Sequence, residues 1–306
     1  MDVYRLFKLM SDRSSHNKRI AKNTLFLYLR MGLVLVVSLF STRVVLQALD
    51  IEDYGINNVV SGFVTMFAFL NTSMSNGVQR FYNFSLGRKN GYSIKDVYNT
   101  ALQIQAILAV TLLVPLETFG MWYIHTQMVI PIDRFAAAQW VFQFSVLSLV
   151  LLVLQIPYSA AIMAYEKMDY YAYLSIFDVL AKLGIAYIIK YTTFDKLILY
   201  GALNMLVSLI CFFLYYGYAK SHFQDLKSDF IIRKQLFKPM LYFSGWNGFG
   251  SFAYMIKSQG LNMLLNVFFG PVVNAARGVS NMAMSAIQGF QSNIVIAFRP
   301  QLIQSY

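Results

Sequence analysis

Long apolar runs separated by short polar stretches dominate the pattern of this chain. Eight such runs of about 20 residues or more cover most of its length, and each is long enough to cross a bilayer. The bilayer core offers no water to backbone polar groups, so each run is predicted to be a helix. The predicted spans are Thr24 to Leu49, Gly55 to Tyr82, Val97 to Leu116, Phe135 to Tyr165, Tyr171 to Tyr191, Leu197 to Ala219, Met240 to Phe268 and Val273 to Phe298. The pattern therefore predicts an all-α integral membrane protein.

A basic segment between the sixth and seventh spans divides the chain. Residues 224–238 alternate apolar side chains with charged ones, a pattern typical of a segment lying at the membrane surface. The predicted organisation follows from this division. It comprises a cytoplasmic N-terminal segment with a possible interfacial helix (1–23), a first six-helix bundle (24–220), a cytoplasmic amphipathic linker (221–239) and the first two helices of a pseudo-symmetric second bundle (240–306).

Polar positions recur along the second and eighth spans and coincide when the chain is shifted by about 220 residues against itself. In the second span they are Asn58, Ser61, Thr65, Thr72 and Gln79. In the eighth span they include Asn281, Ser285 and Gln288, which we predict to line a substrate cavity. A polar stripe is costly against lipid, so these faces must meet other helices or a water-filled cavity. Hydrogen bonding between helices is the simpler alternative to a cavity.

Composition excludes several classes of protein. The chain is 58% hydrophobic and only 13% charged, which leaves no room for a water-soluble catalytic domain beside the spans. Its single cysteine, Cys211, excludes an intrachain disulfide and a cysteine-rich metal site. The three histidines are isolated, and no GxxxxGK[ST] run is present for ATP. We therefore expect no cofactor, no metal and no enzymatic activity.

The basic residues indicate orientation, not nucleic-acid binding. With a cytoplasmic N-terminus, 17 of the 25 Lys and Arg fall in inside segments, 3 in outside loops and 5 within spans. Basic flanks resist translocation, so this asymmetry predicts that both ends are cytoplasmic. The basic residues are scattered over span ends, without the clustered patch that nucleic-acid binding requires.

Two opposite charges lie together in the fifth span. Asp178 and Lys182 are four residues apart, a spacing that places them on one helical face near the bilayer centre. They are predicted to form an ion pair. The pair either neutralises itself as a structural element or couples transport to a proton or cation that competes for the carboxylate.

Four other cations within the spans are candidates for substrate binding: Arg30, Arg43, Lys257 and Arg277. The arginines lie close enough to the span ends for their side chains to reach the interface. Alternatively, their planar guanidinium groups face the cavity and bind phosphate in a bidentate manner. Arg277 is favoured because it belongs to the polar stripe of the eighth span.

The chain resembles the lipopolysaccharide O-antigen and capsular polysaccharide flippases of the multidrug/oligosaccharidyl-lipid/polysaccharide exporter superfamily. The stretches that carry this resemblance are NTLFLYLRMGLVLVVSLFSTRVVLQALDIEDYGINNVVSGF, IPYSAAIMAYEKMDYYAYLSIFDVLAKLGIAYII, FSGWNGFGS, LLNVFFGPVVNAARGVSNMA and FRPQLIQSY. It implies twelve or fourteen helices in two bundles that open alternately to either side of the membrane. The chain is therefore expected to be C-terminally truncated. Basic cavity residues of the family would correspond to Arg30, Arg43, Lys257 and Arg277.

The resulting functional prediction is a bacterial inner-membrane flippase for a polyprenyl-diphosphate-linked oligosaccharide. Its partners would be the lipid-linked oligosaccharide, membrane lipids and the polysaccharide assembly machinery. A cation-coupled multidrug exporter is the first alternative. Such an exporter should have acidic residues in its cavity, whereas the predicted spans contain one acidic residue, Asp178, and five basic ones. A membrane polysaccharide polymerase or acyltransferase should show a large outer loop with clustered Arg and His. A fragment that only docks with envelope machinery is the remaining alternative.

Overall fold

The computed structural model describes residues 3–65, 67–87, 91–126, 130–226, 235–253, 284, 288, 291–292 and 295–296, with side chains from Thr24 onward except at 51, 59, 62, 63, 65 and 68. Every regular element in these residues is a helix. The labelled helices are α1 (Val3–Thr65), α2 (Ala68–Leu86), α3 (Ile94–Pro115), α4 (Met121–Thr126), α5 (Phe135–Ala164), α6 (Met168–Lys190) and α7 (Lys196–His222). A further helical segment, 235–253, carries no label.

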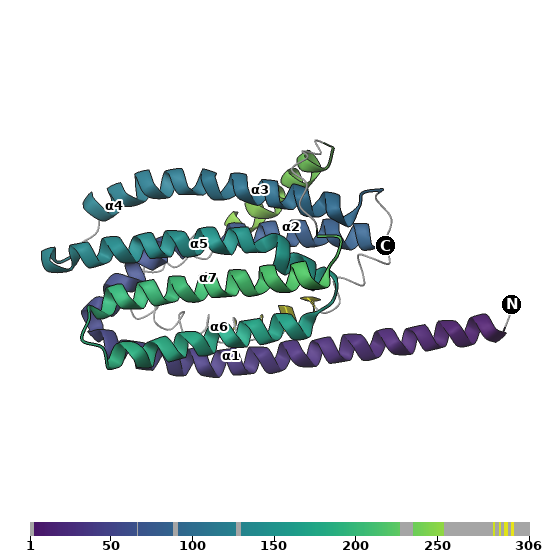
Figure 1. Cartoon of the computed structure of the whole chain (residues 1–306), viewed down its shortest axis with the longest axis horizontal. Coiled ribbons are helices and arrows are strands. Elements are labelled where there is room, and N and C mark those ends of the chain that lie inside the picture. Colours follow the sequence, from purple (N-terminus) through teal and green to yellow (C-terminus); the bar gives the residue numbers. More distant parts are fainter. Residues whose placement is uncertain are drawn as a thin grey trace.

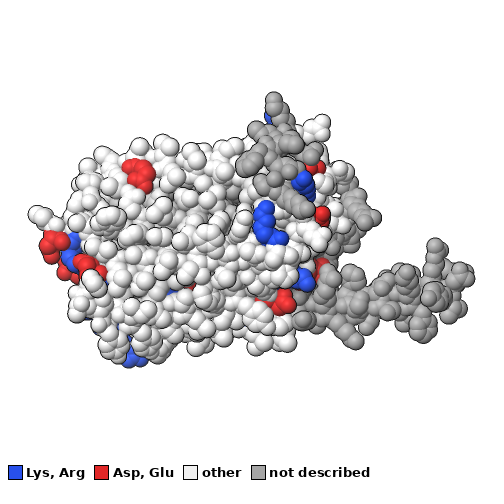
Figure 2. All heavy atoms as spheres, in the orientation of Figure 1, with Lys and Arg blue, Asp and Glu red and all other residues white. Residues whose placement is uncertain are grey.

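Five helical stretches of the described residues are long and apolar enough to cross a membrane. They are Thr24–Asp50, Ile94–Thr126, Ile132–Ala164, Met168–Lys190 and Lys196–His222. Figure 2 shows Lys, Arg, Asp and Glu gathered mainly at the two ends of the helices, with an almost uncharged surface between them. The chain is thus an all-α, multi-pass membrane protein, which confirms the predicted fold class.

The first two predicted spans meet at a sharp turn. α1 is interrupted at Asp50, whose φ of 63° and ψ of 168° are not helical. One non-helical residue therefore makes the break where a five-residue loop was expected. The chain turns again between Thr65 and Ala68, where the Phe67 N–H donates to the Val64 carbonyl at 3.1 Å. The second predicted span is therefore two helical pieces, 51–65 and α2.

Local signals start two of the helices, and one helix continues further than predicted. Ser93 and Asp96 form a reciprocal capping box before α3, and the Asp195 side chain accepts hydrogen bonds from two backbone N–H groups at the start of α7. The predicted outer loop after Leu116 is wrong in its first part. Pro115 is the last residue of α3, and a π-helical turn at Leu116–Gly120 follows it and leads directly into α4. In a π-helical turn the hydrogen bonds join residues five apart instead of four, and the chain stays helical beyond the proline.

The helices of the first bundle pack around α5 (Figure 1). α5 contacts α2, α3 and α7, while α1 runs along α6. Tyr82, Tyr98 and Phe142 are among the largest fully buried side chains of this core. The arrangement leaves α1, α5, α6 and α7 around a common interior, where the candidate site lies.

Segment 235–253 reaches back from the predicted second bundle and packs on α2 in antiparallel register. The pairs in contact are Phe69 with Phe252, Ser73 with Gly248 and Gly77 with Ser244. A Cβ atom at Gly77 would overlap the Ser244 hydroxyl. Small residues four apart on each helix therefore bring the two backbones close together.

Candidate functional site

A cavity of about 560 Å³ lies inside the first bundle. Four helices form its wall: α1, α5, α6 and α7. Its polar and charged lining residues are Arg30, Asn57, Ser61, Ser145, Ser148, Gln155, Ser175, Asp178, Lys182, Tyr200, Asn204, Ser208, Cys211 and Tyr215. Charged and polar side chains at membrane depth are costly unless a protein partner, water or a ligand contacts them.

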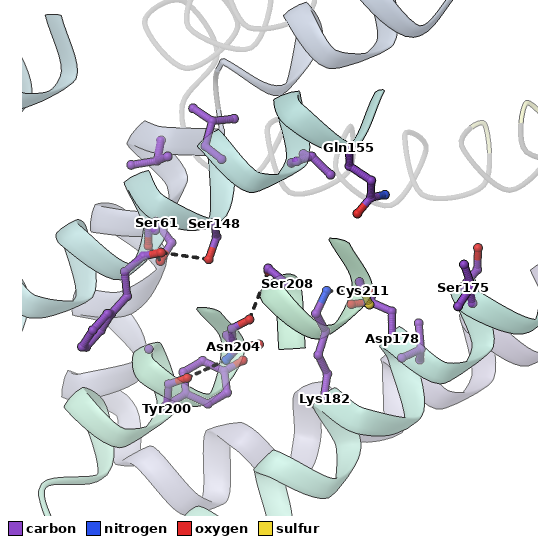
Figure 3. A pocket seen from close by; sticks show the side chains of 18 of the residues that line it. Ser61, Ser148, Gln155, Ser175, Asp178, Lys182, Tyr200, Asn204, Ser208 and Cys211 are labelled. Atoms are coloured by element: carbon purple, nitrogen blue, oxygen red, sulfur yellow. Dashed lines mark hydrogen bonds and ion pairs between the residues drawn. The ribbon is translucent and has the colours of Figure 1, made fainter. Parts of the chain in front are cut away.

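The predicted ion pair is present in this wall. Lys182 Nζ lies 2.8 Å from Asp178 Oδ2. Figure 3 shows the pair on α6 beside Ser208 and Cys211 of α7. Each side chain remains partly accessible, 43% for Lys182 and 32% for Asp178, so both groups contact the cavity as well as each other.

Arg30 of α1 lies where two hollow regions meet. It lines the cavity and also a second hollow of about 450 Å³, which is bounded by α1 and by Ser292 of the eighth predicted span. The Arg30 guanidinium carbon lies 4.8 Å from the Tyr171 ring centroid, a cation–π contact. Its Nε is buried and has no hydrogen-bond partner in the part of the chain that the structure describes. A buried guanidinium N–H without an acceptor is costly, so the position favours an anionic ligand.

The hydroxyl groups of the wall are largely satisfied within their own helices. Ser148, Ser175 and Ser208 each donate to the carbonyl four residues earlier, at 2.8, 2.9 and 3.1 Å. Across the helices, Ser61 Oγ lies 3.1 Å from Ser145 Oγ. Because each hydroxyl oxygen keeps lone pairs after donating, the wall presents hydrogen-bond acceptors to the cavity.

The charges of the described lining residues do not cancel. Arg30 and Lys182 are cationic and Asp178 is anionic, which leaves one net positive charge. No group of three or more His, Cys, Asp or Glu suitable for a metal ion occurs in the described part of the chain. The chemistry that this wall supports is the binding of an anionic or hydroxyl-rich group.

The structure brings together three of the predicted site residues: Arg30, Asp178 and Lys182. Arg43 is exposed and lines neither hollow. Gln288 is also exposed and lies outside both linings. Lys257, Arg277, Asn281 and Ser285 fall outside the described residues.

The polar stripe predicted in the second span is only partly correct. Ser61 lines the cavity and donates a hydrogen bond to Asn57, which also lines it but was not part of the stripe. Asn58 and Thr72 of the stripe are exposed. The cavity residues of the fourth and sixth spans are not among the predicted site residues. Their signal is a polar recurrence at helical spacing: Ser145, Ser148 and Gln155 on α5, and Asn204, Ser208 and Cys211 on α7.

Comparison with known proteins identifies the fold through solved structures alone. No protein-family profile matches the chain, and no curated protein is significantly similar to it. One similar structure is the "Outward-facing conformation of a multidrug resistance MATE family transporter of the MOP superfamily", with a TM-score of 0.77 and 12% identity over 93% of this chain and 64% of that one. Another similar structure is that of a chain named "protein A". It has a TM-score of 0.76 and 13% identity over 94% of this chain and 65% of that one. The chain has this fold and spans less than two thirds of either neighbour.

Proposed function

We propose that this protein is a flippase that moves a polyprenyl-diphosphate-linked oligosaccharide across a bacterial inner membrane by alternating access. The fold supports a transporter of the MOP superfamily, and the resemblance of the sequence to O-antigen and capsular polysaccharide flippases supports this class of substrate. The distribution of basic residues supports a cytoplasmic N-terminus. Lipid-linked oligosaccharide and the polysaccharide assembly machinery are the proposed partners.

The observation that carries the proposal is the position of Arg30. Its guanidinium lies at membrane depth where the two hollows meet, with a buried Nε that has no acceptor among the described residues. A diphosphate supplies acceptor oxygens that match a planar guanidinium. An anionic group that joins a sugar to a lipid tail needs a cation at such a junction.

A cation-coupled drug exporter is the second candidate, since one structural neighbour is a multidrug transporter. A cationic drug requires an available carboxylate. Among the described residues that line the cavity, the carboxylate is Asp178, and it already accepts a hydrogen bond from Lys182 at 2.8 Å. With Arg30 in the same wall, the site repels organic cations, which favours the flippase.

The experiment measures the leaflet in which lipid-linked glycan accumulates when the gene is deleted and then restored. Wild type should clear an accumulation on the cytoplasmic side. Arg30→Gln should lower the flipping rate about 10- to 100-fold, because a charge-assisted hydrogen bond contributes about 1.5–3 kcal/mol. Arg30→Lys should restore part of the rate, since it keeps the charge without the bidentate geometry.

The matched control is Leu29→Ala, the neighbouring residue, whose side chain is 62% exposed. It should flip at the wild-type rate, with all variants present in the membrane at equal amounts. Accumulation in the outer leaflet, or no accumulation in the deletion strain, would contradict the proposal. Equal rates for Arg30→Gln and wild type would remove Arg30 from the mechanism.

A further inference from the structure

One polar face of α2 is open towards the start of the helix and sealed towards its end. Thr72, Asn76, Gln79 and Asn83 recur at a spacing of three or four residues, which places them on one side of α2. Their exposure falls along the helix: Thr72 is exposed, Asn76 is half-buried, Gln79 is 3% exposed and Asn83 is 0% exposed. The sealed end leads into the basic segment 87–95, which the charge distribution predicts to be cytoplasmic.

The amide groups at the sealed end are unsatisfied in this conformation. Asn83 has no hydrogen-bond partner for its Oδ1 or its Nδ2, and Gln79 has none for its Nε2, among the residues that the structure describes. A buried polar group without a partner costs free energy, because it has lost its hydrogen bonds to water. Water that reached this face would supply the partners. The two amides therefore favour a second conformation, in which this end of α2 is open.

The contact between α2 and segment 235–253 borders the sealed face. Ser73 meets Gly248 and Gly77 meets Ser244, and these positions of α2 lie about 100° of rotation from Thr72 and Asn76. Ser73 and Ser244 are 0% and 1% exposed, so water does not reach the contact. Ser73 Oγ has no hydrogen-bond partner in the described part of the chain. The contact joins the two predicted bundles closely and leaves this hydroxyl group unpaired.

Arg80 extends the same contact towards the sealed end of α2. Its guanidinium carbon lies 4.1 Å from the ring centroid of Phe243 on segment 235–253 and 5.1 Å from that of Phe84 on α2. A cation–π contact stabilises the closed arrangement by an amount similar to the cost of one unsatisfied amide. Opposing contributions of similar size keep two conformations close enough in free energy for both to be populated.

We infer that the contact between α2 and segment 235–253 is a gate at the cytoplasmic end and that the structure shows it closed. Opening separates Ser73 from Gly248 and Arg80 from Phe243, and it exposes Asn83 to water. The gate rests on the proposed function only in so far as the protein is a transporter with this orientation, and it does not depend on the substrate.

Labelling from the cytoplasmic side measures the opening without any substrate. Cys211→Ser removes the one cysteine of the sequence, and Asn83→Cys then places a thiol on the sealed face. The full chain in inside-out vesicles is treated with a charged methanethiosulfonate, and mass spectrometry of the peptide gives the rate. An open state populated at about 0.1–10% should make labelling about 10- to 1,000-fold slower than in the denatured protein. The matched control is Val78→Cys, which is 1% exposed in the core of the first bundle and should stay unlabelled.

A disulfide across the contact should lock the gate. A Cβ atom added at Gly248 lies 3.9 Å from the Ser73 Cβ, within the range of about 3.5–4.5 Å that a disulfide requires. In the Cys211→Ser background, oxidised Ser73→Cys/Gly248→Cys should flip substrate at less than about a tenth of its reduced rate, because the open state is no longer reached. With Asn83→Cys added, labelling at that position should fall about tenfold or more. Reduction should restore both rates. The single variants Ser73→Cys and Gly248→Cys are the matched controls and should not respond to the oxidant.

Three results overturn the inference. The first is equal labelling of Asn83→Cys and Val78→Cys, with Gln79→Cys used in place of Asn83→Cys if that variant does not fold. The second is a Ser73→Cys/Gly248→Cys pair that does not cross-link. The third is a cross-linked protein that is labelled, or flips substrate, at the rate of the reduced protein. If no variant flips the lipid-linked glycan but labelling responds to the disulfide, the proposed substrate fails and the gate remains, so the two failures are distinguishable.

Discussion

Arg134 and Asp53, 81 residues apart, are joined by an ion pair at one end of the first bundle. The guanidinium donates to both carboxylate oxygens of Asp53, with 2.7 Å between Nε and Oδ1, and its Nη1 donates to Asp195 at 2.8 Å. Asp53 follows the turn at Asp50, Arg134 precedes α5, and Asp195 caps α7. One arginine therefore connects three turns at the end that the charge distribution predicts to face outward.

Loss of this connection should destabilise the bundle. Arg134→Gln leaves two carboxylates close together without a cation, and we expect a loss of about 1–2 kcal/mol in the free energy of unfolding, since the groups are partly exposed. A thermal melt in detergent measures it. The control is Lys190→Gln, an exposed cation of the same end, which should melt as wild type does. Identical midpoints for both variants would contradict a stabilising role of Arg134.

Asp195 has two roles that different substitutions separate. Its side chain accepts from the Leu197 and Ile198 N–H groups as well as from Arg134. Asp195→Asn keeps a capping oxygen but replaces the oxygen that accepts from Arg134 with an NH2 group, whereas Asp195→Ala loses both contacts. We expect the alanine variant to be less stable than the asparagine variant by about 1 kcal/mol, which is the usual contribution of an N-cap. Equal melting midpoints would show that the cap contributes nothing.

The contact between α2 and segment 235–253 depends on Gly77. Alanine at this position gains helix propensity but overlaps Ser244, so Gly77→Ala should lower stability by about 1–2 kcal/mol. Gly184→Ala on α6 is the matched control, because nothing lies within 4 Å of its added Cβ, and it should be neutral or stabilising. The double variant Gly77→Ala/Ser244→Gly should recover most of the loss. A Gly77→Ala protein as stable as Gly184→Ala would show that the close approach has no energetic weight.

Much of the fold was predictable because apolar runs are local signals. Five predicted spans correspond to long apolar helices of the structure. A break between the first two spans was predicted, although as a loop of five residues and not as one non-helical residue at Asp50. The break before Ala68 was not predicted, since one open turn leaves hydropathy unchanged. The extension beyond Pro115 was missed for the opposite reason: proline usually ends a helix, and here a π-turn continues it.

The site was predictable only where a charge marks it. Arg30, Asp178 and Lys182 stand out in the sequence because charges are rare in spans. The recurrence of Asn58, Thr65, Thr72 and Gln79 at intervals of seven crosses the break before Ala68, so these residues do not share one face. Asn57, one residue or about 100° of rotation from Asn58, lines the cavity instead. The serines of α5 and α7 carry no such mark, because a serine that bonds its own helix is equally common against lipid and beside a cavity.

The Asp178–Lys182 pair can be assigned to structure or to ion coupling by a double-mutant cycle. Asp178→Asn and Lys182→Met each leave one charge without its partner at membrane depth, so each single variant should be less stable than wild type. The double variant removes both charges and should recover stability, with an interaction energy of about 1 kcal/mol for a pair of this exposure. Thermal melts of the four proteins measure the cycle.

Transport by the same four proteins decides between the two roles. A structural pair predicts that the double variant flips substrate at nearly the wild-type rate, because its fold is restored. A coupling pair predicts a stable double variant whose flipping no longer responds to the imposed proton or cation gradient, because the carboxylate that the ion would occupy is gone. We expect the structural result, since Asp178 already has Lys182 at 2.8 Å. A stable double variant that has lost only its response to the gradient would assign the pair to coupling instead.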